Sequence, residues 1–85
     1  MKIQLRFFAS VREKLGTSEE TVILPEQVKT VGDVRLWLVA RGGVWAEVLA
    51  EGRALRMAYN QQMTEAATSI VDGAEVAFFP PVTGG

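Results

Sequence analysis

The chain opens with a strict alternation of polar and apolar residues. Residues 2–7 read Lys-Ile-Gln-Leu-Arg-Phe, and a period of two places successive side chains on opposite faces of an extended strand. The pattern therefore predicts a half-buried first strand. Its inner face would carry Ile3, Leu5 and Phe7, and its outer face Gln4, Arg6 and Phe8.

Two short elements are predicted next. Ser10 and Glu13 have the spacing of a capping box, and Gly16 suits the left-handed end of a helical turn. Residues 20–24 are rich in β-branched side chains and predict a second strand, which Pro25 ends. We expect the two strands to pair as an antiparallel hairpin with a long connection.

The main helix is predicted to begin at Thr30. This residue is a favourable N-cap, Asp33 lies three positions on, and apolar residues recur at helical spacing as far as the glycine pair at 42–43. Residues 44–50 predict another short helix. Trp37 has no cluster of polar residues around it in the sequence, so core packing is its simplest interpretation.

The C-terminal half carries the remaining strands. Residues 55–59 predict a third strand, residues 60–62 a turn, and Met63 a return to extended backbone. A turn signal, Asp-Gly at 72–73, precedes a final strand at residues 75–79. Strands on both sides of one main helix predict an α+β roll.

The prolines that follow the last strand should end it. Pro80 and Pro81 lack the N–H that a ladder requires and favour an extended polyproline geometry. We therefore expect a folded domain at residues 1–79 and an extended tail at residues 80–85. The final glycine pair, without a Cβ atom, suits insertion into a narrow channel.

Alternation also predicts an apolar patch beside the tail. Phe8 and Phe79 should both point away from the helix, and Met63 is expected to join them. An exposed patch of this kind usually marks a partner surface. The other interpretation is that a loop covers these side chains.

Composition narrows the choice of function. The 85 residues are 48% apolar and 22% charged, with a net charge of -1, as expected for one ordered domain. No cluster of basic residues suggests nucleic acid, and no continuous apolar segment suggests a signal peptide or a membrane span. We expect a cytoplasmic protein.

Cysteine and histidine are both absent. This removes thiol nucleophiles, imidazole bases and the usual nitrogen and sulfur ligands of metals, so no metal site is expected. Among the groups that remain, the terminal carboxylate of Gly85 has the most distinctive setting.

The last eight residues, Phe78-Phe79-Pro80-Pro81-Val82-Thr83-Gly84-Gly85, resemble those of a known family. It is the small-subunit family of molybdopterin synthase, the ubiquitin-like sulfur carriers of molybdenum cofactor biosynthesis. The resemblance extends to residues 5–13 and 72–76, whereas residues 17–55 match in pattern only. It implies a ubiquitin-like β-grasp fold, in which a mixed sheet packs on one main helix and the first and last strands are parallel neighbours, with a flexible Gly-Gly tail.

The resemblance also implies a chemistry. An adenylating enzyme related to ubiquitin activators uses ATP to activate Gly85, and a sulfur donor protein converts the adenylate into a thiocarboxylate. The large synthase subunit, which supplies the catalytic side chains, uses this sulfur on cyclic pyranopterin monophosphate to form the molybdopterin dithiolene. No cofactor is bound permanently. The expected partner-binding residues are Phe8, Met63, Phe79, Pro80, Pro81, Val82, Thr83 and Gly84.

Three other functions share the fold. They are a sulfur carrier for thiamin synthesis, a ubiquitin-like modifier joined to lysines, and a β-grasp binding module with an incidental tail. The sequence Phe-Phe-Pro-Pro-Val-Thr before the glycines favours the molybdopterin role over the thiamin role. A binding module would tolerate deletion of Gly84 and Gly85, and the carriers would not.

Overall fold

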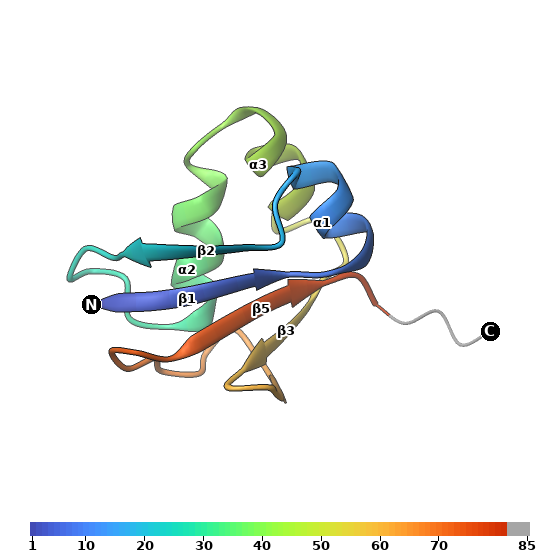
Figure 1. Cartoon of the computed structure of the whole chain (residues 1–85). Helices are drawn as coiled ribbons and strands as arrows, with labels where there is room; N and C mark the ends of the chain where they lie inside the picture. The colour runs from blue at the N-terminus through green and yellow to red at the C-terminus, as the bar shows by residue number, and fades with distance from the viewer. Residues whose placement is uncertain (82–85) are drawn as a thin grey trace.

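The computed structural model describes residues 1–81 (Figure 1). Its elements in chain order are β1 (Lys2–Phe7), α1 (Ala9–Leu15), β2 (Glu19–Ile23), α2 (Val31–Val39), α3 (Gly43–Leu49), β3 (Arg56–Tyr59), β4 (Gln62–Thr64) and β5 (Glu75–Phe79). The predicted strands and helices are all present, with boundaries that differ by a few residues. The predicted ubiquitin-like β-grasp fold is confirmed.

The strands form one mixed sheet in the order β2-β1-β5-β3-β4. β1 pairs antiparallel with β2 and parallel with β5, which brings the two ends of the sequence side by side. β5 is antiparallel to β3, and β3 to β4. The final strand, β5, therefore lies in the middle of the sheet as the parallel neighbour of β1, as the family resemblance implied.

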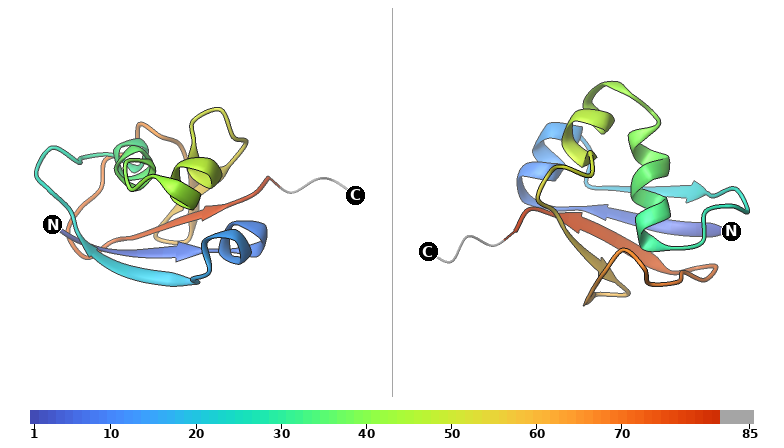
Figure 2. Two further views of the ribbon diagram at one scale, coloured as in Figure 1. Left: turned by 90° about the horizontal axis from the view of Figure 1, so that it is seen from above. Right: turned by 180° about the vertical axis from the view of Figure 1, so that it is seen from behind.

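The core lies between the sheet and the helices on one of its faces. In Figure 2 (left), α2 and α3 lie over one face of the sheet, while α1 lies at the end of β1. Alternate strand residues point into this layer, as the pattern of residues 2–7 predicted. The largest fully buried side chains are Phe7, Phe78, Ile3, Leu5, Leu38, Leu49, Val31, Val34 and Val76.

The start of α2 follows the sequence prediction. The Asp33 backbone N–H donates to Thr30 Oγ1 at 3.1 Å, and the Asp33 carboxylate accepts from the Thr30 backbone N–H at 3.2 Å. This reciprocal pair satisfies two N–H groups that would otherwise lack partners. Backbone hydrogen bonds lower the pKa of the Asp33 carboxyl, because they favour its charged form.

The predicted capping box at Ser10 is wrong. The N-cap of α1 is Phe8, and no side chain caps this helix. Ala9, the first residue of α1, has a positive φ of 52°, so the chain turns sharply as it leaves β1. The predicted end at Gly16 is correct, since this residue has a φ of 76° and donates its N–H to the Arg12 carbonyl.

Arg41 ties the helical layer to the edge of the sheet. Its guanidinium donates to both carboxylate oxygens of Glu20 on β2, at 3.0 and 2.6 Å. The same group lies over the rings of Trp37 and Trp45, at 5.2 and 4.4 Å from their centroids. Both tryptophans pack against the core cluster, which agrees with the structural role predicted for Trp37.

Among residues 1–81, no helix combines the length and the apolar character needed to cross a bilayer.

Candidate functional site

The face of the sheet opposite α2 and α3 carries a row of side chains that cross four strands. Arg6 on β1 is the register partner of Ala77 on β5, which pairs with Ala58 on β3, which pairs with Met63 on β4. Residues paired across strands point to the same face. Two alanines therefore lie between two long side chains.

The short alanine side chains create a groove. Ala58 and Ala77 form its floor, and its volume is about 600 Å³. Ala77 is only 3% exposed although no helix covers it, because the larger side chains around it shield it from solvent. The remaining lining residues are Phe8, Ala9, Gln61, Met63, Glu75, Phe79, Pro80 and Pro81.

The aromatic side of the groove is formed as the alternation predicted. Phe8 and Phe79 lie edge to face, with ring centroids 6.4 Å apart and an interplanar angle of 81°. Phe8 is 40% exposed and Met63 60% exposed. In the described residues, the predicted side chains therefore do meet at one surface, and no loop covers Phe8 or Met63. Their role in partner binding stays a prediction.

The groove adjoins the root of the tail. Pro80 and Pro81 line it directly after the end of β5. The other predicted tail residues, Val82, Thr83, Gly84 and Gly85, lie outside the described residues. The extended tail predicted for residues 80–85 therefore stays a prediction.

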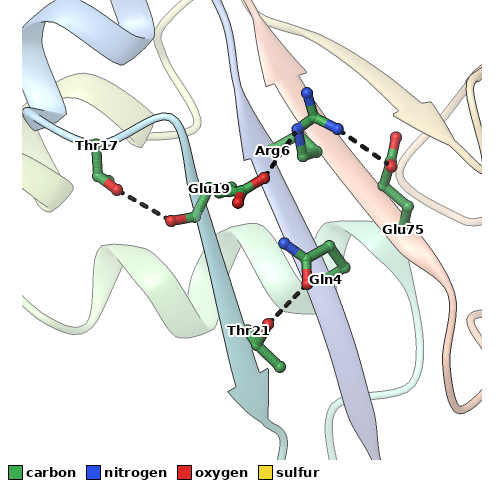
Figure 3. A network of polar contacts seen from close by, with 6 residues as sticks. All are labelled: Gln4, Arg6, Thr17, Glu19, Thr21 and Glu75. Carbon is green, nitrogen blue, oxygen red and sulfur yellow. Dashed lines mark hydrogen bonds and ion pairs between the residues drawn. The ribbon is translucent and has the colours of Figure 1, made fainter.

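The other half of this face is polar. Figure 3 shows Arg6 standing between Glu19 and Glu75, with Gln4 and Thr21 beside them. Arg6 Nε lies 3.8 Å from a Glu19 oxygen, and Arg6 Nη1 lies 3.7 Å from a Glu75 oxygen. Thr21 donates a hydrogen bond to the Gln4 side-chain oxygen at 2.7 Å.

Sequence reasoning placed Arg6 on the outer face but assigned it no function. The signal was a long charged residue between Gln4 and Phe8 on that face. Its neighbours could not be identified because they come from β2 and β5, and only the register of the sheet brings them together.

The described residues contain no group of three or more acidic side chains arranged to hold a metal ion. The side chains around the groove are mainly aliphatic and aromatic, and Gln61 and Glu75 are its two polar members. Such a surface suits contact with another protein, because apolar and aromatic side chains are typical of the buried centre of an interface.

Comparison with known proteins places the chain in a family. The sequence profile of the ThiS family matches residues 5–85, which include the end of β1, all of β5 and the final glycines. The chain belongs to the ThiS family. The match covers nearly the whole sequence, so the family assignment applies to the sheet, the groove and the segment that follows them.

Two curated relatives have the same name. The molybdopterin synthase sulfur carrier subunit of Escherichia coli (strain K12) is 42% identical over 83 residues, which cover 98% of this chain and 99% of the relative. The protein of that name from Haemophilus influenzae is 37% identical with the same coverage. Similarity therefore spans both proteins nearly from end to end.

Two solved structures share the fold. One chain from a protein-protein complex of subunits 1 and 2 of the molybdopterin-converting factor of Helicobacter pylori matches with a TM-score of 0.68 at 21% identity. The match covers 100% of each chain. The small archaeal modifier protein 1 of Methanosarcina acetivorans matches with a TM-score of 0.76 at 23% identity, over 99% of this chain and 96% of the other. These likenesses show the fold alone.

Proposed function

We propose that this chain is the sulfur-carrying subunit of a molybdopterin synthase. The observation that carries the proposal is its similarity, over 98% of its length, to two molybdopterin synthase sulfur carrier subunits. The groove beside Pro80 and Pro81 supports it, because a protein that accepts the tail must also lie against the surface from which the tail leaves.

The reacting group in this proposal is the carboxylate of Gly85. A carboxylate is a poor electrophile, so one oxygen first attacks the α-phosphorus of ATP on an activating enzyme and pyrophosphate leaves. Sulfur that a donor delivers as hydrosulfide then attacks the carbonyl carbon, displaces AMP and loses its proton. The product is a thiocarboxylate, whose ionised sulfur is a soft nucleophile. Sulfur can thus be carried by a chain without cysteine.

The acceptor in this proposal is cyclic pyranopterin monophosphate, held by a larger subunit. That subunit would supply the catalytic side chains, since the segment Val82-Thr83-Gly84-Gly85 contains no acid, base or cation in its side chains. ATP belongs to the activating enzyme and not to this chain. The function of this chain is to deliver the sulfur atom.

Docking of the larger subunit is assigned to the groove. Phe8, Met63 and Phe79 present apolar surface there, and burial of such surface is the main favourable term in association. The tail residues from Pro80 to Gly84 would then pass directly from the docked face into the partner.

Mass spectrometry tests the proposal. The chain is coexpressed with its activating enzyme and a sulfur source, and intact and fragment masses are measured. We expect one oxygen to be replaced by sulfur at Gly85, and alkylation to label the same residue. Sulfur mapped to any other position would refute the carrier function.

A second experiment, on the product of the first, separates a carrier from a protein modifier. A modifier would leave Gly85 in an amide bond to a lysine, whereas a synthase subunit would transfer sulfur to a pterin and return as a carboxylate. Incubation of the sulfur-bearing chain with the large subunit and cyclic pyranopterin monophosphate should give molybdopterin. Lysine conjugates without molybdopterin would favour the modifier.

A further inference from the structure

Arg6 is the strongest unassigned feature of the surface. Its Nε faces Glu19 and its Nη1 faces Glu75, but the separations of 3.8 and 3.7 Å exceed the range of about 2.7–3.2 Å for a hydrogen bond. Within residues 1–81, Arg6 Nε is buried and has no hydrogen-bond partner. The guanidinium is thus held by two long ion pairs, and its Nε makes no hydrogen bond within the described residues.

The position of Arg6 makes it part of the docking surface. It is the register partner of Ala77, which forms the floor of the groove, and its guanidinium lies 5.4 Å from the centroid of the Phe8 ring. A protein that covers Phe8 and fills the groove must also cover Arg6. Its side chain is 36% exposed in the free chain, so docking would remove that part from water.

Burial of this side chain requires a new acceptor. A charged donor that loses water without gaining a hydrogen bond is strongly unfavourable. The docking protein must therefore place an oxygen atom opposite Arg6. Without such an acceptor, the buried guanidinium would weaken binding.

The local charge indicates which kind of oxygen fits. Arg6 contributes one positive charge, and Glu19 and Glu75 contribute two negative charges on the same face (Figure 3). A further carboxylate would add repulsion in a site that excludes water. An uncharged oxygen satisfies the donors without that repulsion.

We propose that Arg6 is the polar anchor of the docking surface, and that the large subunit meets it with an uncharged oxygen, either a main-chain carbonyl or a side-chain amide. This inference rests on the proposed function. It adds a partner contact on the polar half of the face and specifies the chemistry of the partner.

Binding of the full chain to the large subunit tests it by calorimetry. Arg6→Met removes the donors and keeps the stem, and it should weaken binding by about ten- to a hundredfold, the worth of a hydrogen bond to a charged group. Lys29→Met is the matched control, since it removes the same charge from an exposed site near the start of α2. It should leave the dissociation constant unchanged.

Two further variants keep the result decisive. Arg6→Lys retains the charge beside both glutamates and hence the fold, but an ammonium lacks the planar fork, so binding should also weaken. The double variant Glu19→Gln, Glu75→Gln should not bind more tightly than wild type. Tighter binding by this variant would indicate a carboxylate opposite Arg6 and refute the uncharged acceptor.

The outcomes separate this inference from the function on which it rests. If wild type binds and both Arg6 variants bind equally well or better, no acceptor faces Arg6 and the inference fails alone. If wild type does not bind the large subunit at all, the proposed function fails and the inference fails with it.

Discussion

At the scale of single residues, the two members of each adjacent phenylalanine pair, 7–8 and 78–79, differ in their exposure to solvent. Phe7 and Phe78 are buried in the core, with centroids 6.3 Å apart, while Phe8 and Phe79 lie at the groove. The difference arises because successive residues of a strand point to opposite faces. Phe7 and Phe78 therefore stabilise the fold, whereas Phe8 and Phe79 are available to a partner.

Replacement of the outer phenylalanines should affect binding more than folding. Phe8→Ser or Phe79→Ser should weaken binding to the large subunit by about ten- to a hundredfold, since one buried aromatic side chain is worth about 1.5–3 kcal/mol. Calorimetry gives the dissociation constants, and urea denaturation gives the stability of each variant. Ile23→Ser is the control, because this residue is exposed but does not line the groove.

The opposite pattern would contradict the assignment. If the variants at Phe8 and Phe79 unfold while the folded fraction binds normally, these residues belong to the core. Phe78→Ser shows how such a core variant behaves, since this side chain is fully buried.

At the scale of elements, long-range contacts complete what local sequence begins. The capping box of α2 was predictable because Thr30 and Asp33 are three residues apart. The contact between Arg41 and Glu20 was not, because it joins residues 21 positions apart that meet only when the helical layer packs on the sheet. The absence of a side-chain cap on α1 has a similar cause, since Phe8 still follows the path of β1.

The Arg41 contact predicts a dependence of stability on pH. Its hydrogen bonds lower the pKa of Glu20 in the folded state, so the stabilisation is present above the ordinary glutamate pKa and is lost as the pH falls through the lower folded value. At pH 7, Glu20→Gln should reduce the free energy of unfolding by about 1 kcal/mol, a modest amount because both side chains are partly exposed. The difference from wild type should shrink below the ordinary pKa of 4.5.

Urea denaturation followed by tryptophan fluorescence measures this effect, because Arg41 lies over both tryptophan rings. Glu19→Gln is the control in the same strand, since Glu19 is 59% exposed and makes only a long ion pair. An equal loss of stability by Glu20→Gln at pH 3 and at pH 7 would show that the charge of Glu20 is not responsible.

At the scale of the whole molecule, the order of the strands in the sheet places the end of β5 beside the docking groove. β5 runs parallel to β1 in the middle of the sheet and ends beside α1 (Figure 1). Pro80 and Pro81 then line the groove. The proposed function requires that the segment beyond them reach the active site of an activating enzyme and later that of the synthase.

Tail length should therefore be critical. One residue added after Gly85 would move the reacting carboxyl by about 3.5 Å, and a displacement of about 1 Å can already cost a hundredfold in rate. Sulfur transfer should nearly vanish. Gly84→Val should have a similar effect, since a β-branched side chain fills a narrow channel and restricts the backbone.

Both tail variants retain the groove and should still bind the large subunit and compete with the wild-type carrier. A synthase assay and a binding measurement on the same samples distinguish lost chemistry from lost docking. Near-normal sulfur transfer by the extended chain would show that Gly85 is not the reacting residue.

The sequence by itself determined the elements and the faces of the strands. Strict alternation from Lys2 to Phe7 assigned an inner and an outer face, and Pro80 set the end of the last strand. These are local properties, because they follow from the period of a strand and from the lack of an N–H in proline. The ending of the sequence supplied the resemblance to a family of sulfur carriers.

Only the tertiary structure decided what surrounds each outward side chain. The register between β1, β5, β3 and β4 created the alanine floor of the groove, and the pairing with β2 brought Glu19 to Arg6. Cross-strand neighbours are far apart in sequence, and a shift of one residue would turn each side chain to the other face. Alternation can therefore predict that Arg6 points outward, but only the folded sheet places it beside Glu19 and Glu75.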